Sequence, residues 1–212
     1  MASKEDIQNR ALLLIGTEEI SDFTNDSDRK IATLNHFYEE VKNKLLTLRS
    51  WTFALKRVKL EADKDENGAP LENGEDYFKY AFEVPCDMVK LLSVSRFGGR
   101  DLFYAGYELR GNKLYADAPV LYVKYTANPE DGCLPPAFAD LLANALAAEV
   151  CFKLTGDKTK EQALYAKVWG QPSDNLKGGL FGFYAKADAG QNPARALQSQ
   201  PMAAARWTKV GK

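Results

Sequence analysis

The sequence is poor in the residues that carry most enzyme chemistry. Its 212 residues include one histidine, His36, and three cysteines, Cys86, Cys133 and Cys151. A single imidazole almost excludes a histidine-based zinc site, and any Ser-His-Asp or Cys-His arrangement would have to use His36. The cysteines are widely spaced, odd in number and without a CxxC pair, so they predict no disulfide framework. We therefore expect no metal ion, no cofactor and no catalytic residue.

Long apolar runs and an excess of one charge are also missing. The longest apolar blocks, ALLLI and LLANALAAEV, are far shorter than the roughly 18 residues that span a bilayer. The first residues, MASKEDIQNR, are charged and lack the apolar run and cleavage site of a signal peptide. The net charge of −1 gives no global basic field that would attract nucleic acid. These absences predict a soluble protein that is made in the cytoplasm and has no membrane partner.

The clearest positive signal is a helical stripe over residues 31–48. Its apolar residues recur in steps of three and four, and they are Ile31, Leu34, Tyr38, Val41, Leu45 and Leu48. Its other faces carry charged residues such as Lys42 and Lys44. These predict a solvated surface or, as an alternative, a face packed against a neighbouring subunit. After Ser50, the alternation of Trp51, Phe53 and Leu55 predicts a strand, so Trp51 and Phe53 mark a joint between a helix and a sheet.

Four further segments have helical signals. Ser3 is an N-cap with Asp6 as its capping-box partner, and Gly16 suits the position after the last turn. Ser27 or Asp26 would cap the helix of the apolar stripe. The other helices are expected from residue 135 to 156, from 157 or 159 to 169, and as a short helix within residues 177–190.

Between the helices, short alternating segments predict a small β unit. Strands are expected over residues 51–60, 78–84, 88–96, 107–109, 113–115 and 119–126, with a hairpin around Gly111. The fold class is therefore α+β: an antiparallel bundle of about four helices, an inserted and mostly antiparallel β domain, and an extended C-terminal arm. The expected boundaries are 1–50 and 129–188 for the two parts of the bundle, 51–128 for the β domain, and 189–212 for the arm.

The arm has an unusual composition. Residues 189–212 contain no acidic residue, carry four positive charges and have no amphipathic run long enough to build a core. Composition alone predicts a flexible tail, and a tail of this kind is seldom ordered unless it docks on something. We expect it to lie against a partner or another subunit. A tail that folds back on its own domain is the alternative.

No residue pattern points to catalysis. Glu149 is the best single candidate because it lies near the apolar face of its helix, but a packing role with a polar partner is the stronger interpretation. The glycine pairs at 98–99 and 178–179 match no phosphate-loop motif. The tyrosines of the β unit are flanked by acidic residues and not interleaved with basic ones, so sheet packing explains them better than base stacking.

The order of several motifs resembles the head-to-tail adaptor family of podovirus-type phages, which includes the tail tubular protein A group. The first motifs of this resemblance are RALLLIG at residues 10–16 and EISDFTNDSD at residues 19–28. Next comes a helix that ends in an aromatic W-x-F-A run, here residues 51–54. The later motifs are FEVPCDMVKLLSV at residues 82–94, ADAPVLYVKYTANPED at residues 116–131 and the alanine-rich helix after it. The resemblance covers roughly residues 7–169.

This resemblance implies a virion structural protein without enzymatic activity. Members form a ring, typically of twelve subunits, beneath the portal protein, in the neck or tail of a virion assembled in the host cytoplasm. The ring extends the channel through which genome DNA passes without sequence-specific contact, and it is the platform for the tail nozzle. The C-terminal arm is commonly the portal-binding element. Here the binding residues would be Arg195, Leu197, Met202, Arg206, Trp207 and Lys209.

Two other functions remain open at this point. One is a tail-associated hydrolase, which would need a cleft holding two carboxylates with opposed pKa shifts. The other is an oligomeric binding module unrelated to phage.

Overall fold

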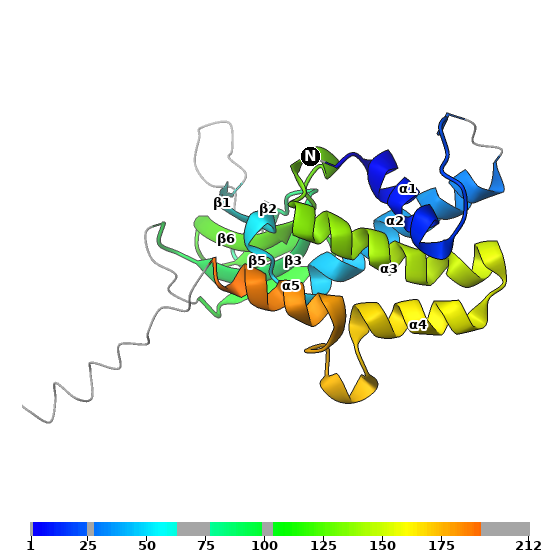
Figure 1. The fold of residues 1–212 in the computed structure, drawn as a ribbon. Coiled ribbons are helices and arrows are strands. Elements are labelled where there is room, and N and C mark those ends of the chain that lie inside the picture. Colours follow the sequence, from blue (N-terminus) through cyan, green and yellow to red (C-terminus); the bar gives the residue numbers. More distant parts are fainter. Residues whose placement is uncertain (1, 25–27, 63–76, 99–103, 192–212) are drawn as a thin grey trace, which may run out of the picture.

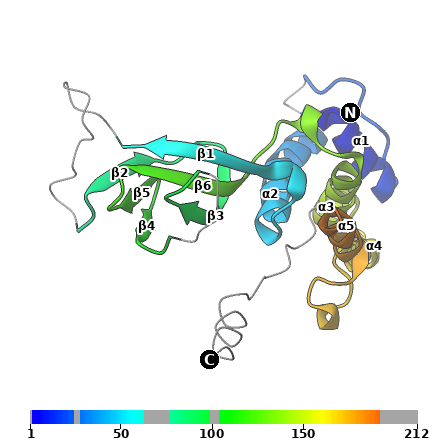
Figure 2. The same cartoon turned by 90° about the vertical axis from the view of Figure 1, so that its left-hand side faces the viewer.

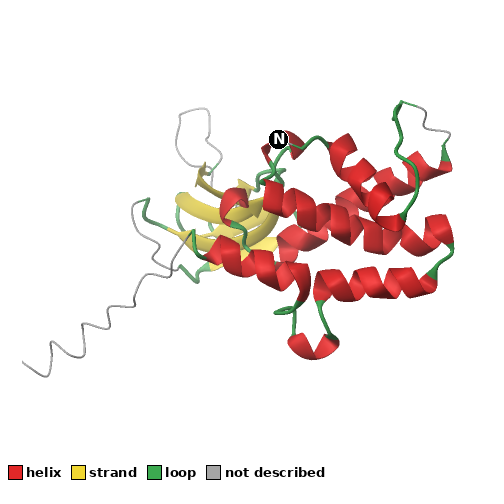
Figure 3. Cartoon of the chain, in the orientation of Figure 1, coloured by secondary structure: helices red, strands yellow, loops and turns green. Residues whose placement is uncertain are grey.

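The computed structural model describes residues 2–24, 28–62, 77–98 and 104–191. Within them the chain forms a helical bundle with a β unit at one side (Figure 1). The helices are α1 (Lys4–Ile15), α2 (Arg29–Leu48), α3 (Pro136–Thr155), α4 (Lys158–Trp169) and α5 (Gly179–Ala189). The strands are β1 (Leu55–Glu61), β2 (Tyr80–Glu83), β3 (Met88–Ser95), β4 (Tyr107–Arg110), β5 (Lys113–Ala116) and β6 (Val120–Ala127). Figure 3 shows that helix and strand are segregated, which confirms the α+β class.

The predicted ends of α1 are confirmed by its capping geometry. Ser3 accepts a hydrogen bond from the backbone N–H of Asp6, and the Asp6 carboxylate accepts one from the N–H of Ser3. Gly16 adopts a φ of 78°, the left-handed conformation that ends a helix with little strain when there is no Cβ. These local groups hold the helix that carries the first motif of the resemblance.

The long helix α2 forms where the apolar stripe predicts it, but its N-cap and its last stripe residue differ from the prediction. Its N-cap is Asp28, whose side chain accepts from the N–H of Lys30, so the predicted caps were wrong. Those two residues, Asp26 and Ser27, lie outside the described ranges. Five of the six stripe residues are buried, but Leu48, the last residue of the helix, is 41% exposed because it lines surface hollows. Leu46 is buried in its place.

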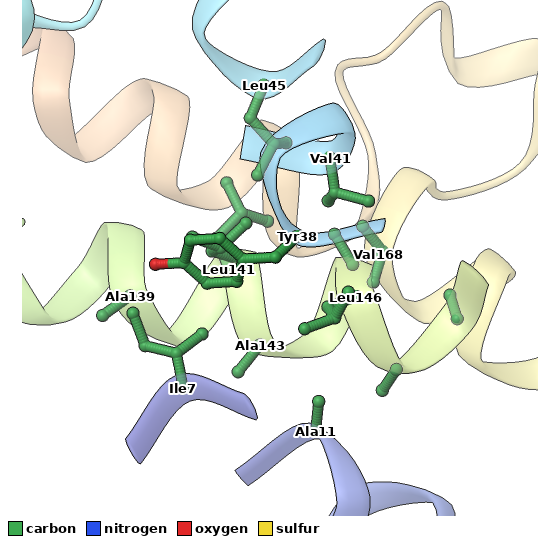
Figure 4. Packing of buried hydrophobic residues seen from close by; sticks show 14 of the residues in the cluster. Ile7, Ala11, Tyr38, Val41, Leu45, Ala139, Leu141, Ala143, Leu146 and Val168 are labelled. Atoms are coloured by element: carbon green, nitrogen blue, oxygen red, sulfur yellow. The ribbon is translucent and has the colours of Figure 1, made fainter. Parts of the chain in front are cut away.

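Helix α3 is the centre of the bundle. Its residues 141–148 are all buried, because α1, α2, α4 and α5 each pack on it. Alanines on most of its faces allow these close approaches. Figure 4 shows Ile7 and Ala11 of α1, and Tyr38 and Val41 of α2, directed at it from different sides. Phe152, in the last turn of this helix, is exposed.

The β unit consists of two three-stranded antiparallel sheets, with the strand orders β1-β6-β3 and β2-β5-β4. The predicted hairpin is formed by β4 and β5, and Gly111 supplies the positive φ of its turn. A second apolar core, separate from that of the bundle, fills the space between the sheets; it includes Phe82, Leu114, Leu121, Val123 and Tyr125. In Figure 2 the unit extends away from the helices on one side.

Two predicted segments differ in the structure. Residues Thr52–Ala54 form a turn of 3-10 helix, and β1 begins only at Leu55, so the predicted strand over residues 51–54 was wrong. The bundle has five helices in the described ranges, where about four were expected, because α5 is a full helix of 11 residues. Its glycine-rich start weakened the helical signal in the sequence. None of the helices in the described ranges is long and apolar enough to cross a membrane.

Candidate interaction surfaces

The predicted joint residues Trp51 and Phe53 lie together where the bundle meets the β unit. Trp51 is buried, and its indole Nε1 donates a hydrogen bond of 2.9 Å to the carbonyl of Leu45. Its ring lies 5.3 Å from the ring of Phe138 and 6.0 Å from that of Phe181, both in edge contact. The ring of Phe53 lies 4.9 Å from Phe138. The joint is therefore an aromatic cluster that α2, α3 and α5 share.

A carboxylate from the end of α5 fixes the turn after the joint. Asp188 is nearly buried and accepts hydrogen bonds from the backbone N–H of Thr52 at 3.1 Å and from its hydroxyl at 2.6 Å. Its other oxygen lies 3.6 Å from Nε of Arg49. These contacts explain why residues 52–54 turn instead of continuing as a strand. The partner is 136 residues away in the sequence, so no local pattern signalled it.

The returning end of the β unit is held by a buried ion pair. The amino group of Lys42 lies 2.7 Å from the carboxylate of Asp131 and donates to the carbonyl of Pro129 at 2.7 Å. The hydroxyl of Tyr38 donates to the same Asp131 oxygen at 2.9 Å. Burial, together with the charge of Asp131, raises the pKa of Tyr38 well above its usual range. Lys42 therefore does not belong to the solvated face on which the sequence placed it.

A second polar cluster lies at the base of the β unit. Asp87 accepts from Lys56 at 2.6 Å and from the hydroxyl of Tyr125 at 3.0 Å. Burial alone would raise the pKa of Asp87, but the hydrogen bonds from Lys56 and Tyr125 outweigh it and hold that pKa below its usual range. Burial and the neighbouring Asp87 raise the pKa of Tyr125 to about 12. The cluster links β1, β6 and the turn before β3, and it has the geometry of a structural ion pair.

The residues weighed for catalysis have structural partners. Glu149 accepts from Lys44 of α2 at 3.0 Å, which is the polar partner expected for a packing residue. His36 is exposed, and its ring meets that of Phe37 edge-on at 4.8 Å. Asp140, which was not a candidate from the sequence, accepts from the hydroxyl of Tyr184 at 2.5 Å and pairs with Arg10. In the described part of the chain, no three His, Cys, Asp or Glu side chains gather as metal ligands would.

An apolar groove of about 730 Å³ opens in the described surface. It lies between the end of α2, helix α4 and the turn that follows α4. Its walls include Leu48, Tyr165 and Leu176, which are 41%, 48% and 42% exposed, and its polar rim carries Lys44 and Glu161. Three large apolar side chains exposed in one hollow are typical of a surface that another chain covers.

The turn that completes this groove has a strained backbone. Asn175 and Leu176 have positive φ angles of 48° and 62°, and for leucine this conformation is unfavourable. Asp174 fixes the turn, since its carboxylate accepts from the N–H of Gln171 at 2.9 Å. Gly179 packs so closely on the end of α4 that a Cβ there would lie 2.5 Å from the carbonyl oxygen of Val168. The fold thus holds Leu176 at the groove against its backbone preference. The sequence signals of this turn were Pro172 and the glycines at 170, 178, 179 and 182.

The predicted partner-binding residues of the arm, Arg195, Leu197, Met202, Arg206, Trp207 and Lys209, all lie outside the described ranges. The structure therefore brings together the two joint residues, and the arm residues stay a prediction. No protein-family model matches the chain, and no curated protein matches it.

Proposed function

We propose that this protein is a head-to-tail adaptor of a podovirus-type phage. In this proposal it is a virion structural protein without enzymatic activity, which forms a ring beneath the portal protein and is the platform for the tail nozzle. Twelve subunits would surround the channel through which the genome passes. The proposal rests on the ordered motifs of the sequence and on where those motifs lie in the fold.

The observation that supports it most is the position of the aromatic W-x-F-A run. Trp51 and Phe53 occupy the point where the chain leaves the bundle for the β unit, and the run packs against α3 and α5. Other motifs of the resemblance also coincide with structural boundaries. The sequence RALLLIG ends α1 at Gly16, and the residues before Asp131 return the chain to the bundle. The motifs thus lie at the points where the chain passes between the helical bundle and the β unit, and at the end of α1.

The arrangement suits a subunit that works by contact. The bundle has its own core, and so does the β unit, while Trp51, Asp188 and Lys42 fix the connections between them. A subunit of fixed shape can repeat around a ring with one kind of contact between neighbours. The arm, with its arginines and its apolar residues Leu197, Met202 and Trp207, would supply the contact with the portal.

The test is an assembly experiment with the portal protein of the same phage. The full chain is mixed with assembled portals, and the product is measured by light scattering and electron microscopy. A twelve-fold ring, with an added mass about twelve times the 23.6 kDa of one chain, is expected. A chain lacking residues 192–212 should keep its helical circular dichroism and fail to bind. A full chain that leaves the portals bare would refute the proposal and favour a binding module unrelated to phage.

A further inference from the structure

The apolar groove continues along α5 toward the end of the described chain. A second hollow, of about 230 Å³, shares Leu48 and Leu176 with the groove and reaches Ala189, the last residue of α5. Together the two hollows form one surface, which we call the α4–α5 groove. It runs from Tyr165 to Ala189, and Ala189 lies two residues before Gln191, where the described chain stops. The 21 residues that follow therefore start beside one end of the groove.

We propose that residues 192–212 bind the α4–α5 groove of their own chain in the free protein. These residues include three large apolar side chains, Leu197, Met202 and Trp207, which match the apolar character of the groove. An extended segment from residue 192 to residue 207 spans up to roughly 53 Å, whereas α5 is only about 16 Å long. A tethered segment also has an effective concentration on the order of millimolar, so even weak contacts keep it bound.

Charge sets the direction in which the segment lies. Its cations are concentrated at the far end, in residues 206–212, and Arg195 is the one cation before them. The far end of the groove carries Glu161 of α4 on its rim, together with Lys44 of α2, whose charge is paired with Glu149 at 3.0 Å. The near end is bordered by Lys177 and Lys186 of the turn and of α5. A path from α5 to α4 therefore takes the basic end of the segment away from these lysines and toward Glu161.

This inference does not depend on the proposed function, because it concerns the isolated protein. If the protein is an adaptor, the segment has to leave the groove before it reaches a portal. The groove would then compete with the portal for the same residues, and groove variants would bind portals faster.

The first test is a comparison of amide spectra. Full-length protein labelled with ¹⁵N is compared with its Trp207→Ala variant. The variant should keep the helical circular dichroism of wild type, and shifts are expected at amides that line the groove, such as those of Tyr165, Gly170 and Leu176. Amides of the β unit are the internal control. A spectrum without changes in the groove overturns the proposal.

The second test measures protection from trypsin at the bond after Arg195. We expect wild-type protein to be cleaved there at least tenfold more slowly than Leu176→Glu, which places a charge in the groove. The matched control is Leu13→Glu, at a residue of α1 that is 56% exposed and outside the groove. It should behave as wild type. Equal cleavage of wild type and Leu176→Glu overturns the proposal. Protection that disappears on hundredfold dilution also overturns it, because the occupant is then a second copy.

Discussion

Removal of the Asp131 carboxylate should destabilise the protein more than removal of a surface charge. The Lys42 side chain is only 4% exposed, whereas that of Asp131 is 25% exposed. In Asp131→Ala the buried ammonium keeps one described partner, the carbonyl of Pro129 at 2.7 Å. The hydroxyl of Tyr38 loses its acceptor as well.

The magnitude follows from the burial of the pair. Deleting one partner of a buried ion pair costs about 3–5 kcal/mol, and the remaining carbonyl puts Asp131→Ala near the lower limit, at about 3 kcal/mol. In the double variant Lys42→Met/Asp131→Ala no charge is left inside. The remaining loss is then the unsatisfied Tyr38 hydroxyl, about 1 kcal/mol. The double variant should therefore be about 2 kcal/mol more stable than Asp131→Ala alone.

Urea unfolding followed by circular dichroism measures these free energies. The control is Glu149→Ala, which breaks the pair between Glu149 of α3 and Lys44 of α2, the helix that also carries Lys42. The side chains of Glu149 and Lys44 are 32% and 41% exposed. Exposed pairs contribute at most about 1 kcal/mol, so this variant should be close to wild type. If the double variant is no more stable than Asp131→Ala, the desolvation of Lys42 does not decide the outcome, and the reasoning is refuted.

Two further predictions concern the core and the pH dependence. Leu45→Ala should cost about 2–5 kcal/mol by urea unfolding, whereas Leu48→Ala, one turn later but 41% exposed, should cost less than about 1 kcal/mol; equal losses would contradict the burial pattern. Because the pKa of Tyr125 is raised to about 12, its contribution to stability is fully present below about pH 10 and is lost as the pH rises toward 12. Tyr125→Phe should therefore lose less stability than wild type between about pH 10 and about pH 12, and an identical loss in both proteins would argue against the pKa shift.

Elements whose signals are local were predicted well. The capping box of Ser3 and Asp6, the glycines that end α1 and α3, and the turn at Gly111 depend on groups within a few residues of each other. For the same reason the strand alternation of β6 was read correctly, with Leu121, Val123 and Tyr125 directed inward. Such signals do not require knowledge of what packs on the element.

Two of the errors come from partners distant in sequence. Trp51 and Phe53 alternate as in a strand, but Asp188 captures Thr52 from across the fold and turns the backbone there. Lys42 lies on a helix face whose sequence predicts exposure to solvent, yet Pro129 and Asp131 of the loop after β6 cover it. In both cases the deciding contact joins residues that are far apart in the sequence, Thr52 with Asp188 and Lys42 with Asp131. A single sequence does not show which distant residues meet.

The groove was missed for a related reason. Its apolar residues come from three segments, α2, α4 and the turn at Leu176, and none of these segments shows an exposed apolar stripe by itself. The positive φ of Leu176 is imposed by close glycine packing against α4, whereas local propensity alone would favour another conformation. The joint at Trp51, by contrast, was visible because aromatic residues gather there in the sequence.

The connections of the β unit to α2 have a mechanical consequence. Three residues of that helix, Lys42, Leu45 and Thr47, contact three separate parts of the β unit and its connections: the return loop, Trp51 and Lys90 of β3. A force applied to the outer strands is therefore transmitted to α2 at several points, and the β unit cannot rotate about a single bond. Such a force would strain the core of the bundle on which α2 packs.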